Sequence, residues 1–196
     1  MENPTSGESP APIPVQPTKP ICTTSFTDIV THWAQKEIEN IACQGIIIGY
    51  PDGTFKPNNS ITREHVALMF TRAFELAPIR GPIEFTDVPK NHRYYDAITE
   101  VYRAGIFDGA SDEKFNPNTH MTRAQMAKVL VLAFELQPSE TSTNVFRDVS
   151  EAHWAKDYIA TLADNGIALG DNGNFKPEES VTRAQFVAFM YRALNL

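Results

Sequence analysis

The 196-residue sequence lacks several features that would assign it to a common functional class. It has no run approaching the 18 apolar residues of a membrane-spanning helix, so we expect no membrane insertion. Basic residues are outnumbered, with 17 Lys and Arg against 24 Asp and Glu and a formal net charge of -7. This balance argues against a surface for nucleic acid or for an anionic membrane.

Catalytic motifs are also missing. The sequence contains no Gly-x-Ser-x-Gly, no His-Glu-x-x-His and no phosphate-binding glycine loop. Its acidic residues recur at repeated positions, which is typical of structural motifs. We therefore expect a protein that is not an enzyme and that uses no cofactor.

Cysteine is scarce, and Cys22 and Cys43 have neither metal-binding nor redox spacing. In an oxidising compartment they can form a disulfide that ties down the N-terminal arm. The alternative is two unpaired small hydrophobic residues. The start, Met-Glu-Asn-Pro, is too polar for a signal peptide, which leaves a cytosolic protein, a mature segment or a fragment as interpretations.

Residues 1–25 are rich in proline, serine and threonine, which predicts an extended arm or linker. From Phe26 onwards the chain repeats, and we divide it into repeats 26–80, 81–141 and 142–196. The repeats share a Phe-x-Asp motif, a histidine, an apolar pattern with helical spacing and a glycine that ends it. The glycines are Gly45, Gly105 and Gly166.

A loop and a longer helix complete each repeat. The loop begins at Gly49, Gly109 or Gly170 and ends at Phe55, Phe115 or Phe175, which we expect to be buried. Eight residues after each phenylalanine comes an arginine, namely Arg63, Arg123 or Arg183. The apolar residues that follow predict a second helix, longer than the first helix of about three turns, with a wide apolar face.

Each of these arginines directly follows a threonine that we predict to be the N-cap. Thr-Arg-Ala-Gln forms a capping box in the second and third repeats, whereas the first repeat has His65 in place of glutamine. An arginine in the first turn opposes the helix dipole, which typically costs a few tenths to about 1 kcal/mol. Its threefold recurrence suggests that a ligand requires a guanidinium there.

One such repeat buries too little apolar surface to be stable alone. We therefore predict an all-α fold in which three helix-loop-helix repeats share a core. The long helices form a central bundle, the short helices form three outer lobes, and the whole is a pseudo-threefold spindle.

Together, the motifs Phe-x-Asp-Val, His-Trp, Gly-x-x-Asp-Gly-x-Phe-x-Pro and Thr-Arg-Ala-Gln resemble the S-layer homology (SLH) domain. The resemblance covers residues 26–196 and implies an extracellular anchoring module of the bacterial cell wall or S-layer. It implies non-covalent binding of a secondary cell-wall polysaccharide attached to peptidoglycan, often with pyruvylated sugars, in grooves between repeats. The module would be a monomeric part of a larger surface protein.

The residues support this interpretation independently. A helix N-terminus offers unpaired N–H groups, and an arginine beside it offers a planar fork, so together they suit a carboxylate on a sugar. The expected ligand contacts are three arginines, three aspartates, three aromatic residues and three glycines: Arg63, Arg123, Arg183, Asp28, Asp87, Asp148, Trp33, Tyr94, Trp154, Gly49, Gly109 and Gly170.

Structural alternatives exist for most of these residues. The arginines could form ion pairs with the aspartates of a neighbouring repeat, and the aspartates could cap the short helices. The motif histidines, His32, His92 and His153, are expected to be surface or capping residues. Asp52, Asp112 and Asp171 lack the ligand spacing of an EF-hand, so we expect no metal.

The repeats also differ from one another. The second has Arg93 where the others have tryptophan, and the first has Glu64 and His65 beside its arginine. We expect Glu64 to neutralise Arg63 and the grooves to differ in affinity. The alternative functions are a helical-repeat adaptor for proteins and a module that binds peptidoglycan directly.

Overall fold

The computed structural model describes residues 22, 25–111, 113–139 and 146–196. This part of the chain contains six α-helices and no strand, which confirms the all-α class: α1 (Gln35–Cys43), α2 (Arg63–Ala73), α3 (Tyr95–Arg103), α4 (Arg123–Ala133), α5 (Lys156–Asp164) and α6 (Arg183–Leu194). None of these helices is long and apolar enough to cross a bilayer. Most of the expected arm at 1–25, and Asp112, lie outside the described residues.

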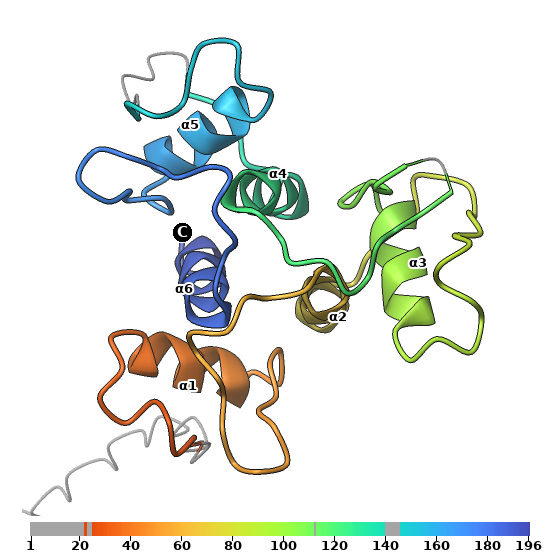
Figure 1. Ribbon diagram of the computed structural model, residues 1–196, viewed down its shortest axis with the longest axis horizontal. Coiled ribbons are helices and arrows are strands. Elements are labelled where there is room, and N and C mark those ends of the chain that lie inside the picture. The colour runs from red at the N-terminus through yellow and green to blue at the C-terminus, as the bar shows by residue number, and fades with distance from the viewer. Residues whose placement is uncertain (1–21, 23–24, 112, 140–145) are drawn as a thin grey trace, which may run out of the picture.

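Three long and three short helices alternate along the chain, and Figure 1 shows how they are arranged. The long helices α2, α4 and α6 lie around the centre and are viewed nearly end-on. The short helices α1, α3 and α5 lie outside them, each in a separate lobe with its loops. The buried residues of all three lobes belong to one continuous hydrophobic core.

Each short helix is amphipathic and ends at a glycine, as expected. In α1, Ile38 and Ile41 are fully buried three residues apart. The chain then leaves the helix at Gly45, whose φ of +74° is a left-handed conformation that glycine adopts without strain.

The long helices begin at the predicted threonines. Thr122 and Thr182 each form a complete capping box with the glutamine three residues later. In α2 the threonine hydroxyl instead lies 2.8 Å from Nδ1 of His65. Phe55, Phe115 and Phe175, which end the preceding loops, are fully buried, as expected.

Helix packing crosses the repeat boundaries. α3 packs against α2, and α5 packs against α4, so each lobe joins a short helix to the long helix of the preceding repeat. α1 packs against α6, which closes the arrangement between the first and last repeats (Figure 1). A repeat defined by sequence is therefore not a packing unit by itself.

A ring of backbone hydrogen bonds joins the three segments that precede the long helices. The N–H of Ile61 donates to the carbonyl of Val181 (3.0 Å), Val181 donates to Met121 (2.9 Å), and Met121 donates to Ile61 (3.0 Å). All three side chains are fully buried. Each repeat therefore fixes the start of another repeat's long helix.

Cys22 and Cys43 form a disulfide. Of the two possibilities left open by the sequence, the structure therefore has the bridged form. It ties residue 22 to the last residue of α1.

Candidate functional site

The three arginines at the starts of the long helices reach into the loop of the next repeat. Arg183 donates from Nε to the carbonyl of Phe55 (2.9 Å), and its guanidinium lies 4.5 Å from the centroid of that ring. Arg63 does the same with Phe115 (2.9 Å) and Arg123 with Phe175 (2.6 Å). Only 4–8% of each arginine is exposed. Burial lowers the pKa of all three, yet a guanidinium stays protonated at neutral pH.

The backbone amides at these helix starts are occupied, contrary to the expectation from sequence. The N–H of Arg183 donates to the carbonyl of Asn59 (2.8 Å), and that of Ala184 donates to the carbonyl of Pro57 (2.9 Å). The next amide donates to the hydroxyl of Thr182. α2 and α4 repeat the two inter-repeat bonds. Hence the guanidinium, rather than the helix amides, is the group available to an anion.

The motif aspartates also bind the loops. Asp28 accepts the N–H of Phe55 (2.8 Å) and of Lys56 (2.7 Å), and Asp87 and Asp148 hold the equivalent loops in the same way. No direct ion pair joins these aspartates to the three arginines, so the ion-pair alternative is wrong as a contact. Each aspartate still acts on one arginine through its charge, because it opposes the lowering of that arginine's pKa by burial.

The aspartates do not cap the short helices either. The N-cap positions are Ala34, Tyr94 and Ala155, without a side-chain cap. The amides at these positions donate instead to Nδ1 of the motif histidines, His32, His92 and His153. The histidines were expected to be surface or capping residues, and each of them binds the backbone at the start of a short helix without forming a side-chain cap.

Three cavities lie between the repeats, and each is lined by residues from all three. Groove 1, of about 260 Å³, is formed by residues 46–51, α2, Arg93, Tyr94 and Arg183. Groove 2, of about 240 Å³, is formed by residues 106–109, α4, Arg63 and Trp154. Groove 3, of about 340 Å³, is formed by residues 169–176, α6, Arg123, Glu179 and Trp33.

Each groove contains one of the expected arginines, one glycine and one aromatic residue, and the three expected aspartates lie outside all three grooves. Position 49 has no room for a side chain, because an added Cβ would lie 2.2 Å from a ring carbon of Phe26 and 2.7 Å from the carbonyl oxygen of Thr54. Trp33 and Trp154 are 60% and 55% exposed. They present aromatic faces to solvent at the groove walls.

Residues adjacent in sequence point into different grooves. Arg63 lines groove 2, whereas His65, two residues later on α2, lines groove 1. Glu64 lies near His92, with 3.7 Å between Oε2 and Nε2, and not against Arg63. The expectation that Glu64 neutralises Arg63 is therefore wrong. Burial raises the pKa of Glu64, and the charges of His92 and Arg93 oppose that shift.

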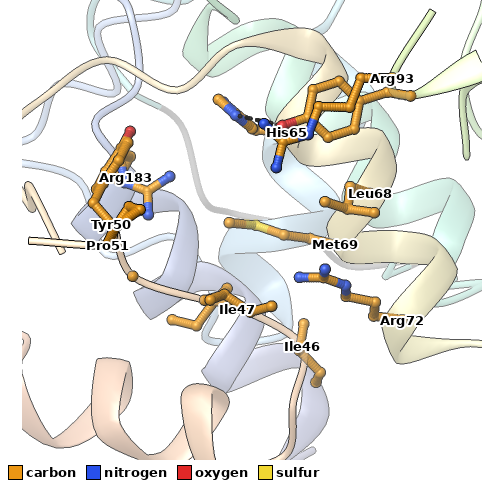
Figure 2. Close-up of a pocket in the computed structure, with 13 residues that line it drawn as sticks. Ile46, Ile47, Tyr50, Pro51, His65, Leu68, Met69, Arg72, Arg93 and Arg183 are labelled. Atoms are coloured by element: carbon orange, nitrogen blue, oxygen red, sulfur yellow. Dashed lines mark hydrogen bonds between the residues drawn. The ribbon is translucent and has the colours of Figure 1, made fainter. Parts of the chain in front are cut away.

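The walls of groove 1 carry unusual positive charge. Arg72, Arg93 and Arg183 line it without any acidic residue, and Figure 2 shows Arg72 and Arg183 approaching from opposite sides. Sequence reasoning missed Arg72, and it noted Arg93 only as a departure from tryptophan. A repeated spacing in the sequence could have identified Arg72. It lies nine residues after Arg63, and Arg192, which lines groove 3, lies nine residues after Arg183.

His65 is the histidine in the lining of groove 1. Its Nε2 lies 3.4 Å from the hydroxyl of Tyr94. Burial lowers the pKa of His65, and the nearby charges of Arg183 and Arg93 lower it further. An anion in the groove would oppose these arginine charges.

The loop aspartates have ordinary turn partners. Asp52 accepts hydrogen bonds from Thr54, and Asp171 pairs with Lys176 at 2.8 Å. Within the described ranges, no cluster of three His, Cys, Asp or Glu residues is placed to hold a metal ion.

Known proteins share this repeat. The S-layer homology domain model matches residues 25–67, 84–127 and 145–187. The chain is 35% identical over 171 residues to a surface-layer 125 kDa protein of Lysinibacillus sphaericus, covering 85% of this chain and 14% of that protein. It is 36% identical to a cellulosome-anchoring protein of Acetivibrio thermocellus, covering 75% of this chain and 35% of that protein.

An amylopullulanase of Thermoanaerobacterium thermosulfurigenes is 31% identical over 177 residues, covering 87% of this chain and 10% of that enzyme. The chain thus spans only a minor part of each relative. The family match recurs at three successive positions and covers more than half of the sequence. The chain therefore belongs to the S-layer homology family and carries three of its domains in tandem.

Proposed function

We propose that this chain anchors a bacterial surface protein to the cell wall. It does so without a covalent bond, by binding an anionic secondary cell-wall polysaccharide, such as one with pyruvylated sugars, in the grooves between its repeats. Its family and its relatives among S-layer and cellulosome-anchoring proteins support a role at the cell surface. The chain spans 14% and 35% of those two relatives, which supports a module of a larger surface protein, and we infer that this module is a monomer.

The observation that carries the proposal is the state of Arg183. Its Nε is held by the carbonyl of Phe55, and no described carboxylate forms an ion pair with it. Its terminal nitrogens therefore face groove 1 in a fixed orientation (Figure 2). A guanidinium held in this way is suited to two parallel hydrogen bonds with a carboxylate, such as that of a pyruvyl ketal.

The rest of each groove suits a sugar. Aromatic side chains at the walls, Tyr94, Trp154 and Trp33, offer flat apolar faces to a pyranose ring. Three grooves on one rigid body raise the total affinity when several bind one polymer.

We infer that this module is not itself an enzyme. The amylopullulanase matches this chain over 10% of its length, which is consistent with a shared anchor joined to different partners. Direct peptidoglycan binding and protein binding are the competing functions of this module.

Binding to purified cell-wall sacculi tests the proposal. The chain should sediment with intact sacculi and remain in solution after hydrofluoric acid has stripped the secondary polymer. Arg183→Gln should weaken sedimentation at least about tenfold, since it removes a charge-assisted bidentate contact. Arg147→Gln, at an exposed position outside the grooves, is the matched control and should bind normally. Undiminished binding to stripped sacculi would instead support peptidoglycan or protein recognition.

A further inference from the structure

Groove 1 gathers positive charge against the composition of the protein. Three arginines and no acidic residue line it, whereas the whole chain has 24 acidic and 17 basic residues. Like charges that share a cavity repel one another, so the arrangement is unfavourable until an anion enters. A local conflict of this kind is typical of a functional site.

The other two grooves have acidic residues in their linings, and these offset part of the positive charge. In groove 2, Asp108 pairs with Lys128 and also with Arg80 (2.8 Å), and these partners hold the pKa of Asp108 below its usual value against the effect of burial. In groove 3, Lys176 pairs with Asp171, and Glu179 in the lining acts on Arg123. Asp28 acts on Arg183 in the same way, but it lies outside the lining of groove 1. Each of these grooves therefore has less uncompensated positive charge than groove 1.

The arginines of groove 1 are placed for two separate anionic groups. Arg183 and Arg72 approach from opposite sides of the cavity, with Met69 and Ile47 between them (Figure 2). The side chain of Arg72 forms no hydrogen bond or ion pair with another described residue, and it is exposed. Arg93 lies over the ring of Tyr94, 5.4 Å from its centroid.

The size of the cavity limits the ligand. About 260 Å³ lies below the roughly 300–1,000 Å³ of sites for drug-sized molecules, so groove 1 accepts a short segment of a polymer. A segment with one acidic group would satisfy Arg183 and leave the opposite wall without a partner.

We propose that groove 1 selects a glycan segment that carries two acidic groups, one bound by Arg183 and the second by Arg72, with Arg93 adding positive potential. The proposal rests on glycan binding by the grooves and adds the number of charges that groove 1 recognises. Each acidic group is a carboxylate or a phosphate, since both match the fork of a guanidinium. Arg72 is thereby a specificity-determining residue.

Calorimetric titration with three disaccharides tests this inference. The first is unmodified, the second bears one pyruvyl ketal, and the third bears the ketal and a phosphate monoester on the other sugar. The native protein should bind the third at least about tenfold more tightly than the second, with one such site per chain. In Arg72→Gln this gain should disappear, while affinity for the singly acidic sugar should fall much less than affinity for the doubly acidic one.

Arg147→Gln removes the same charge outside the grooves and should retain the gain. Equal affinity of the native protein for the two acidic sugars, or a gain that survives in R72Q, would overturn the inference and leave anchoring intact. Failure of all three sugars to bind, or binding unaffected by Arg183→Gln, would contradict the proposed function itself. Circular dichroism of each variant establishes that the fold is retained.

Discussion

Asp28 and Arg183 hold opposite sides of the same residue. The carboxylate of Asp28 accepts the N–H of Phe55 at 2.8 Å, and Nε of Arg183 donates to the carbonyl of Phe55 at 2.9 Å. Asp28 belongs to the first repeat and Arg183 to the third, so a single loop residue joins the two ends of the sequence. The same arrangement recurs around Phe115 and Phe175.

Replacing Asp28 should therefore affect stability more than recognition. Asp28→Asn removes a charged acceptor for two backbone amides and should lower the free energy of unfolding by about 1–3 kcal/mol. Urea denaturation measures this loss. Asp52→Asn, in an exposed turn, is the control and should change the free energy of unfolding much less. Because Asp28 lies outside the grooves, a tenfold loss of sugar affinity in folded D28N would contradict its structural role.

The capping box missing from α2 offers a stabilising change. Gln125 and Gln185 complete their boxes by accepting the N–H of the preceding threonine, whereas α2 has His65 at this position. His65→Gln should therefore raise the free energy of unfolding at pH 7.5 by about 0.5–1 kcal/mol. Thermal and urea unfolding check it. A lower stability of H65Q would show that the contacts of His65 with Thr62 and Tyr94 outweigh the missing cap.

The stability of the native chain should fall between pH 7.5 and 5.5 through His65. Burial and two arginines lower its pKa in the folded state, so below about pH 6.5 the unfolded state binds the proton more readily. The loss begins near the unfolded pKa and is complete below the folded pKa. Unfolding free energies of native protein and H65Q across this range measure the contribution as a difference. Parallel curves for the two proteins would contradict the prediction.

Glu64 provides an internal check with the opposite sign. Its pKa is raised in the folded state, chiefly by burial, so protonation favours folding. Glu64→Gln should therefore stabilise the chain at neutral pH, and the benefit should diminish as the pH falls below the raised pKa. A benefit that grew on acidification would show that its proximity to His92, at 3.7 Å, outweighs desolvation.

The disulfide should contribute to stability through the unfolded state. Cys22 and Cys43 are 21 residues apart, and closing a loop of this length is worth up to about 3 kcal/mol in the chain-entropy model. Reduction should lower the midpoint of thermal unfolding accordingly. The double variant Cys22→Ser, Cys43→Ser is the control and should show the lower midpoint with or without reductant. An unchanged midpoint on reduction would mean that the disulfide does not contribute to the stability that thermal unfolding measures.

Local sequence patterns were enough to predict the helices and the residues that bound them. Thr122 and Gly45 specify a helix start and a helix end through contacts within a few residues, and the structure confirms both. A phenylalanine recurs before each Thr-Arg motif, and this recurrence was enough to predict that Phe55 is buried. These signals are local, so a single chain reveals them.

The residues that line each groove could not be predicted from their order in the sequence. Arg63 and His65 lie two residues apart and face different grooves, because each groove draws residues from all three repeats. The amides of the helix starts were predicted to be free, but carbonyls of another repeat occupy them. These contacts form only when the three repeats pack together, with each short helix against the long helix of another repeat.

Closure between the first and last repeats yields the final prediction. α6 covers α1, and α5 covers α4, so a chain ending at residue 144 would expose the apolar faces of α1 and α4. It would also lose the carbonyl of Val181, which accepts the N–H of Ile61 in the central ring.

An open solenoid would keep about two thirds of its helical signal and a cooperative transition after losing one repeat, because its repeats contact only their neighbours. Here we expect circular dichroism to show little helix and no cooperative melting, and we expect recovery when residues 145–196 are added in trans. Cooperative unfolding of the two-repeat chain would instead mean that the contacts of α2 with α3 suffice without the ring.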